Sequence, residues 1–190
     1  MDPKFAITFY RKVFGYFKAD EKIYFEVESD EFFSKHADVL NNSGIDVAFI
    51  DGLHTYEQSL KDVENCLRYL NEKGVIVMHD CKPTTYAMAF PAKTIEDAEN
   101  AKLDGWTGEW CGDVWKTIVH LRSSRPDLEI FVLDCDYGVG VIIKGTAKKM
   151  LNYNTAEIPR LTFYDLWDNR EMLLNIKSPK YLSQLLKARI

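Results

Sequence analysis

Two short apolar runs, separated by a helical pattern, constrain the fold of this chain more than any other feature. Residues 46–50, DVAFI, and residues 75–78, VIVM, have the β-branched and aromatic character of strands. Between them, residues 55–74 begin with a capping-box spacing, continue with apolar residues at helical intervals and end at a glycine. Strand, helix and strand within about thirty residues predict a right-handed βαβ unit with parallel strands.

Other β-rich runs extend this unit into a larger α/β domain. Residues 23–28, IYFEVE, form one more strand-like run, and residues 129–134 and 138–144 flank the turn sequence DCDYG. We therefore expect an α/β fold with a mainly parallel sheet that closes in an antiparallel strand pair. The sequence contains no internal repeat and no obvious linker, so we predict a single domain over residues 1–190. Its expected parts are an N-terminal helix over 1–20, a core over 23–145 and a helical tail over 150–190.

Composition excludes some classes of function. The formal net charge is -5, and no long basic run is present, so nucleic acid is not an expected partner. The chain shows neither a signal-peptide pattern nor an apolar run of about 20 residues, which predicts a cytoplasmic protein without a membrane partner. Its four cysteines stand far apart and form no CxxC pair, so we expect reduced thiols.

Polar side chains follow both strands of the predicted unit. Asp51 and His54 come after the first strand, and His79 and Asp80 come after the second. Neighbouring parallel strands lie only ~4.8 Å apart, so these groups can reach one point. Each cluster alone is more simply explained as capping and packing. Two converging carboxylates, however, repel unless a cation or a shared proton lies between them, and together the clusters predict a site for Mg²⁺ or another divalent cation.

These stretches resemble a known enzyme family. The segment DVAFIDGLHTYEQSLKDVENCLRYLNEKGVIVMHDC resembles the second half of a class I S-adenosylmethionine-dependent methyltransferase, of the small-molecule O-methyltransferase type that includes macrocin-like enzymes. CGDVWKTIVHLR and EIFVLDCDYGVGVIIKG resemble the helix before the last two strands and the closing antiparallel pair of that fold. The resemblance covers roughly residues 23–145 and implies a Rossmann-like sheet.

The resemblance also implies roles for individual residues. In cation-dependent O-methyltransferases such as catechol O-methyltransferase, an Asp after the fourth strand binds the metal and a polar pair after the fifth strand completes the site. The resemblance places Asp51, His79 and Asp80 there as metal ligands. His54, three residues after the first ligand, takes the place of the general base, where those enzymes use Lys. S-adenosylmethionine is the implied cofactor, and Ser29, Asp30, Asp51 and Gly52 are the residues expected to border it.

One departure from the family pattern bears on function. Those enzymes bind their cofactor on a glycine-rich turn after the first strand, but only Gly15 precedes IYFEVE. We therefore expect an N-terminally truncated core that lacks the first strand, the first helix and the second strand. IYFEVE is then expected beside 46–50, and the N-terminal helix is expected to support a homodimer.

Two functions of different class follow. The first is a metal-assisted O-methyltransferase that acts on a hydroxyl of a small molecule or sugar. The alternative is a non-catalytic interaction protein on a truncated methyltransferase core.

In the long connection after residue 81, the aromatic residues Tyr86, Trp106 and Trp110 either form a lid or pack on the sheet edge. Asp113 is expected to cap the helix that follows it.

Overall fold

The main sheet combines parallel and antiparallel strands. The structure, a computed structural model, describes residues 6–10 and 22–189. In these residues, four strands form a sheet of order β3-β4-β6-β5, namely β3 (Ile45–Ile50), β4 (Leu70–Met78), β6 (Val139–Lys144) and β5 (Leu128–Leu133). β3 and β4 are parallel, and β6 is antiparallel to both β4 and β5. β5 therefore runs in the same direction as β3 and β4, so the predicted α/β class, the mainly parallel direction and the closing antiparallel pair are confirmed.

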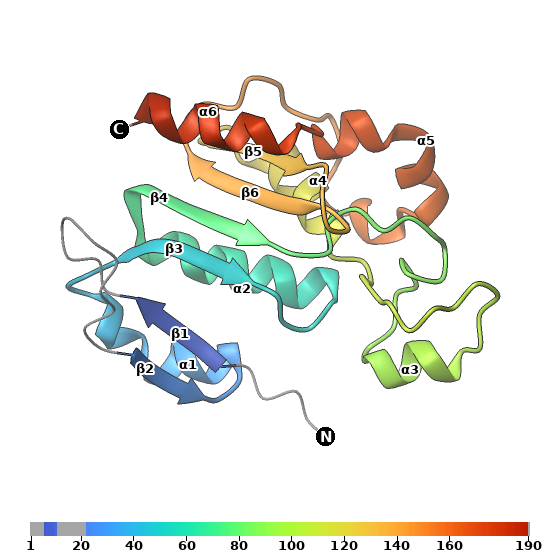
Figure 1. The fold of residues 1–190 in the computed structure, drawn as a ribbon, viewed down its shortest axis with the longest axis horizontal. Coiled ribbons are helices and arrows are strands. Elements are labelled where there is room, and N and C mark those ends of the chain that lie inside the picture. The colour runs from blue at the N-terminus through green and yellow to red at the C-terminus, as the bar shows by residue number, and fades with distance from the viewer. Residues whose placement is uncertain (1–5, 11–21, 190) are drawn as a thin grey trace.

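Helices cover one face of this sheet and part of the other (Figure 1). On the first face, α2 (Tyr56–Tyr69) and α4 (Trp115–Ser124) pack against the strands, and α5 (Phe163–Leu174) follows after the short helix η2 (Ile158–Arg160). The main core lies between this face and these helices. Its fully buried residues include Ile76, Met78, Trp115, Ile118, Leu121, Ile142, Ile158 and Leu166.

The predicted connecting helix begins where expected and ends early. The Thr55 side chain accepts a hydrogen bond from the Gln58 backbone N–H at 3.4 Å, as an N-cap does. α2 ends at Tyr69, and β4 starts at Leu70, so the predicted stop at Gly74 is wrong. Gly74 lies inside β4 instead, and a Cβ there would stand 2.7 Å from the Ile45 carbonyl oxygen. Because Gly74 has no side chain, it lets the backbones of β3 and β4 approach closely, and it does not terminate α2.

The N-terminal part departs most from expectation. β1 (Ala6–Tyr10) and β2 (Lys22–Glu26) form an antiparallel two-stranded sheet of their own. Residues 6–10 of the expected helix are therefore a strand, and the rest of 1–20 lies outside the described residues. β2 pairs with β1 and does not take the place expected beside β3. The residues ITFY are β-branched or aromatic, and pairing with β2 satisfies their backbone groups, which favours the strand.

The homodimer expectation drew on that N-terminal helix and so loses part of its basis. It stays a prediction, and light scattering checks it, since a monomer has a mass of 22.0 kDa.

The smaller helices α1 (Ser29–Lys35) and η1 (Ala37–Leu40) connect β2 to β3, with Phe32 and Leu40 buried in the main core. α3 (Ile95–Asn100) lies in the long connection after β4.

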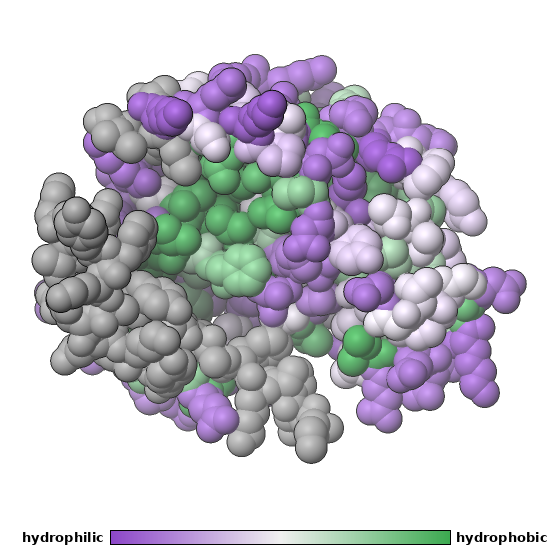
Figure 2. Space-filling view, in the orientation of Figure 1, coloured by the Kyte–Doolittle hydropathy of each residue, from purple (hydrophilic) through white to green (hydrophobic). Residues whose placement is uncertain are grey.

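Among the described residues, the helix that covers the second face of the sheet lies over β5 and β6. There, α6 (Pro179–Arg189) packs on a small cluster of buried residues, which are Phe131, Leu133, Val141 and Ile143. Cross-strand pairing places Phe49 in register with Val77 and Val141, so the three side chains share this face. Phe49 is 63% exposed and Val47 is 67% exposed. Figure 2 shows the resulting hydrophobic area where β3 and β4 lie in Figure 1.

Two other sequence expectations concern cysteines and the C-terminal tail. The four cysteines, all within the described residues, are free thiols, and Cys66, Cys81 and Cys111 are buried. The tail packs against the domain as predicted, since Leu166, Leu173 and Leu174 of α5 are buried. Of the helices in residues 22–189, none combines the length and apolar character that a membrane crossing requires.

Candidate functional site

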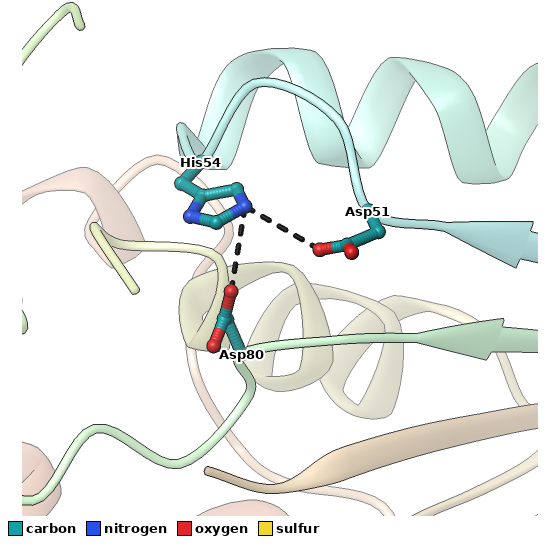
Figure 3. Close-up of side chains that lie close together, drawn as sticks. All are labelled: Asp51, His54 and Asp80. Carbon is teal, nitrogen blue, oxygen red and sulfur yellow. Dashed lines mark ion pairs between the residues drawn. The ribbon is translucent and has the colours of Figure 1, made fainter. Parts of the chain in front are cut away.

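Three predicted site residues converge at one edge of the sheet (Figure 3). Asp51 follows β3 and Asp80 follows β4, and because these strands are parallel, their carboxyl ends meet at that edge. His54, from the loop before α2, places Nε2 at 3.5 Å from Asp51 Oδ1 and 3.3 Å from Asp80 Oδ2. One ligand atom from each of the three residues lies within 4.8 Å of the others.

The His54 ring is held from behind by the connection that precedes α4. Its Nδ1 lies 2.6 Å from the Trp110 carbonyl oxygen, and the two rings are 5.5 Å apart. A carbonyl oxygen only accepts, so Nδ1 carries the hydrogen, and in the neutral ring Nε2 turns its lone pair to the carboxylates. The Trp110 indole N–H in turn donates to the Phe90 carbonyl at 2.8 Å. Trp110 is 7% exposed, which supports packing rather than a lid for this residue.

Asp80 sits in an unusual backbone and charge environment. Its φ of 58° lies in the left-handed region, which costs energy for a residue with a side chain. The side chain is 8% exposed, and Oδ1 accepts a hydrogen bond from the Cys111 thiol at 3.3 Å. Burial, together with the Asp80 carboxylate, raises the pKa of Cys111, so this thiol stays a donor. Cys111 was not among the predicted ligands.

His79 joins the same carboxylates from the other side. Its Nδ1 lies 3.5 Å from Asp51 Oδ1 and 3.2 Å from Asp80 Oδ2, and its Nε2 lies 3.1 Å from Asp136 Oδ2. Burial opposes a charge on the ring. The hydrogen bond to Asp136 and the nearby Asp80 and Asp51 outweigh burial, and the pKa of His79 lies above its ordinary value.

Asp136 is a site neighbour that sequence reasoning missed. It lies in the turn DCDYG between β5 and β6, which was interpreted only as a turn. The predicted order of the closing strands could have located it. A turn that follows a strand parallel to β4 lies at the same sheet edge as Asp80.

The residues expected to border the cofactor lie partly elsewhere. Ser29 and Asp30, at the start of α1, contact the first turns of α2. The Gln58 side-chain N–H₂ donates to Ser29 Oγ at 3.1 Å and to Asp30 Oδ1 at 3.2 Å, and Lys61 Nζ lies 2.5 Å from Asp30 Oδ2. The hydrogen bond from Lys61 lowers the pKa of Asp30. Gly52, which is half-buried, follows Asp51 in the loop of the three-residue cluster.

Asp113 caps a different helix from the one expected. The N-cap of α4 is Val114, with no side-chain cap, so the prediction for Asp113 is wrong. Its Oδ1 accepts from the backbone N–H of Tyr56, the first residue of α2, at 2.6 Å, and its Oδ2 pairs with Lys116 at 3.1 Å. A carboxylate at the start of α2 stabilises that helix from across the fold. Local spacing could not show this, because the two residues are brought together only by packing.

The chemistry of the donor set fits a divalent cation. His54 Nε2 and His79 Nδ1 each lie within 3.5 Å of Asp51 Oδ1 and Asp80 Oδ2, and in neutral rings all four atoms can present lone pairs. Such a set repels unless a cation or additional protons lie among the four atoms. Carboxylate and imidazole ligands together suit ions such as Mn²⁺ and Zn²⁺, while oxygen ligands suit Mg²⁺. Protonated imidazoles that form ion pairs are the alternative arrangement.

Comparison with known proteins adds one match. A family model described as a methyltransferase domain matches residues 11–81, which is less than half of the chain and includes β2, α1, β3, α2 and β4. No curated protein and no solved structure matches the chain. Asp51, His54 and Asp80 all lie within the matched segment. The match over residues 11–81 supports the predicted resemblance to a class I, S-adenosylmethionine-dependent methyltransferase, whereas the cation-dependent O-methyltransferase type is not confirmed.

Proposed function

We propose that this chain transfers a methyl group from S-adenosylmethionine to a hydroxyl of a small molecule or sugar, with Asp51, His79 and Asp80 as ligands of a divalent cation. His54 is the general base in this proposal. One observation carries it. His54 turns a free ring nitrogen to two carboxylates from adjacent strands, while the Trp110 carbonyl holds its other nitrogen.

The proposed methyl transfer requires S-adenosylmethionine as its only co-substrate. A lone pair of the acceptor oxygen forms a bond to the methyl carbon, and the carbon–sulfur bond breaks with its electrons left on sulfur. S-adenosylhomocysteine leaves, and the acceptor proton goes to His54 Nε2. A divalent cation would lower the pKa of the hydroxyl and hold it in place. The fixed Nδ1 bond keeps His54 in the tautomer that can accept the proton.

His54 also has the geometry of a ligand, and variants separate the two roles. Titration calorimetry with Mn²⁺ on the full chain is the measurement, and release of S-adenosylhomocysteine with a panel of glycosides and phenols reports turnover. Asp51→Asn and Asp80→Asn are each expected to weaken Mn²⁺ binding at least ~10-fold, because each removes a charged ligand. His54→Ala is expected to retain Mn²⁺ affinity and to abolish turnover. A matching loss of Mn²⁺ affinity in His54→Ala would instead make His54 a ligand.

The second candidate is a non-catalytic interaction protein, and one observation favours it. Val47 and Phe49 are large, exposed and adjacent on the partly covered sheet face. Exposed apolar patches of this kind are common at protein interfaces. Titration of the chain with S-adenosylmethionine, with and without Mn²⁺, distinguishes the candidates. Binding that Mn²⁺ strengthens supports the enzyme, while no binding under either condition leaves the interaction protein.

A further inference from the structure

We propose that Asp136 is a positioning residue that orients the His79 ring so that Nδ1 faces the cation site. This inference rests on the proposed function, because it assumes that His79 is a cation ligand. Asp136 Oδ2 lies 3.1 Å from His79 Nε2. A carboxylate only accepts, so Nε2–H donates to it, and the neutral ring then presents the Nδ1 lone pair to Asp51 and Asp80.

The turn that carries Asp136 has an uncommon backbone. Asp136, Tyr137 and Gly138 have φ values of 44°, 52° and 88°, so three consecutive residues adopt the left-handed region. This conformation is unfavourable for each residue that has a Cβ. A turn of this kind persists only where the surrounding structure holds it in place. The contacts that hold the turn therefore determine its position in the fold.

Those contacts join the turn to the loop that carries His79 and Asp80. The Cys81 backbone N–H donates to the Gly138 carbonyl at 2.9 Å, and the Lys82 N–H donates to the Tyr137 carbonyl at 2.6 Å. Lys82 Nζ also forms an ion pair with Asp134, which is exposed and adds little to the position of the turn. A Cβ on Gly138 would lie 2.7 Å from the Lys82 backbone nitrogen, so only glycine allows this approach. Backbone contacts thus set the position of Asp136 relative to His79.

The exposure of Asp136 indicates that folding does not require its side chain. The side chain is 71% exposed, while that of His79 is 21% exposed. An exposed ion pair contributes little to stability. A carboxylate that holds the second nitrogen of a metal-bound histidine, in contrast, typically changes metal affinity by about 10- to 100-fold. The expected effect of Asp136 is therefore on cation binding rather than on folding.

Calorimetric titration of the full chain with Mn²⁺ tests this role. Asp136→Ala is expected to weaken Mn²⁺ binding by about 10- to 100-fold with an unchanged melting temperature. Asp134→Ala is the matched control, because Asp134 lies in the same turn but pairs with Lys82, and its Mn²⁺ affinity is expected to stay near that of the wild type. In a His79→Ala background, Asp136→Ala is expected to have no further effect, since its effect passes through that ring.

The outcomes separate this inference from the proposed function. If the wild type and Asp51→Asn bind Mn²⁺ equally poorly, the cation site itself is wrong, and the role of Asp136 falls with it. If Asp51→Asn loses binding while Asp136→Ala matches the wild type, only the role of Asp136 is overturned. An equal loss for Asp136→Ala with and without His79 would also overturn it, because a general charge effect would then explain the result.

Discussion

At the scale of single residues, Gly112 determines how closely the connection before α4 approaches the His54 loop. Its φ is 58°, and a Cβ on Gly112 would lie 1.8 Å from the His54 carbonyl oxygen. We predict that Gly112→Ala destabilises the protein by more than the roughly 1–2 kcal/mol that a left-handed alanine costs, because the backbone must also move apart. Urea unfolding measures the loss, and displacement of the Trp110 carbonyl from His54 is also expected to reduce turnover.

Gly105 provides the matched control for that substitution. Its φ is 78°, but no heavy atom beyond the two adjacent residues lies within 4 Å of the position that a Cβ would take. Gly105→Ala is therefore expected to show only the conformational cost of the left-handed backbone. Equal losses of stability for the two variants would show that the contact between Gly112 and His54 carries no energetic weight.

At the scale of elements, a part-buried pair joins α2 to α4. The Tyr56 hydroxyl and His120 Nδ1 lie 2.6 Å apart, and Tyr56 is 8% exposed. Burial lowers the pKa of His120, which the nearby Glu64 carboxylate opposes. Burial also raises the pKa of the Tyr56 hydroxyl, and the nearby Asp113 carboxylate adds to this shift. Both side chains are therefore neutral in the folded protein at pH 7.

This pair predicts a dependence of stability on pH. A histidine with a lowered folded-state pKa disfavours folding as it is protonated, so its contribution is complete above the unfolded pKa of about 6.5 and falls as pH decreases through that value. We expect the unfolding free energy to decrease more between pH 8 and pH 5 for the wild type than for His120→Gln. His79 has a raised pKa and contributes with the opposite sign, so the difference between the two proteins is the quantity to compare.

A null difference would contradict the prediction. If the wild type and His120→Gln lose equal stability between pH 8 and pH 5, His120 is not kept neutral by the α2–α4 contact. Urea unfolding followed by circular dichroism at several pH values provides the curves. The variant retains a polar side chain beside Tyr56, so a large loss at pH 8 is not expected.

At the scale of the whole molecule, the described part of the chain covers the second face of the sheet unevenly, with α6 over β5 and β6. Phe131 is fully buried under α6, whereas Phe49, on the same face, is 63% exposed. We predict that Phe131→Ala costs about 3–5 kcal/mol of unfolding free energy, because a large buried ring leaves a cavity. The same substitution at Phe49 is expected to cost about 0.5 kcal/mol or less. Chemical denaturation of both variants gives the comparison.

A large cost at Phe49 would show that something covers this half of the face in solution. Whether the cost depends on protein concentration would then separate a second copy of the chain from another part of the same chain. If Phe131→Ala proved as mild as a surface substitution, the packing of α6 on β5 and β6 would be wrong. The paired design keeps the chemistry of the substitution constant and varies only the burial.

Local pattern was enough to predict much of the core and part of the site. The apolar runs around β3, β4, β5 and β6 predicted strands because their residues favour a pleated, buried surface. Asp51, His54, His79 and Asp80 could be predicted to meet because parallel strands end at one edge. Local pattern failed at residues 6–10, where an aromatic and β-branched run suits a helix or a strand, and only the presence of β2 selects the strand.

The sequence by itself determined the class of fold, the βαβ unit and the convergence of the two carboxylates, because periodicity and strand direction depend on residues close together in the chain. Only the tertiary structure decided what holds these groups in place. Trp110 lies behind His54, Cys111 lies beside Asp80, Asp136 lies behind His79, and Asp113 caps α2. Each of these contacts joins residues more than thirty positions apart, and hydrogen bonds between such residues follow from packing, which no local spacing encodes.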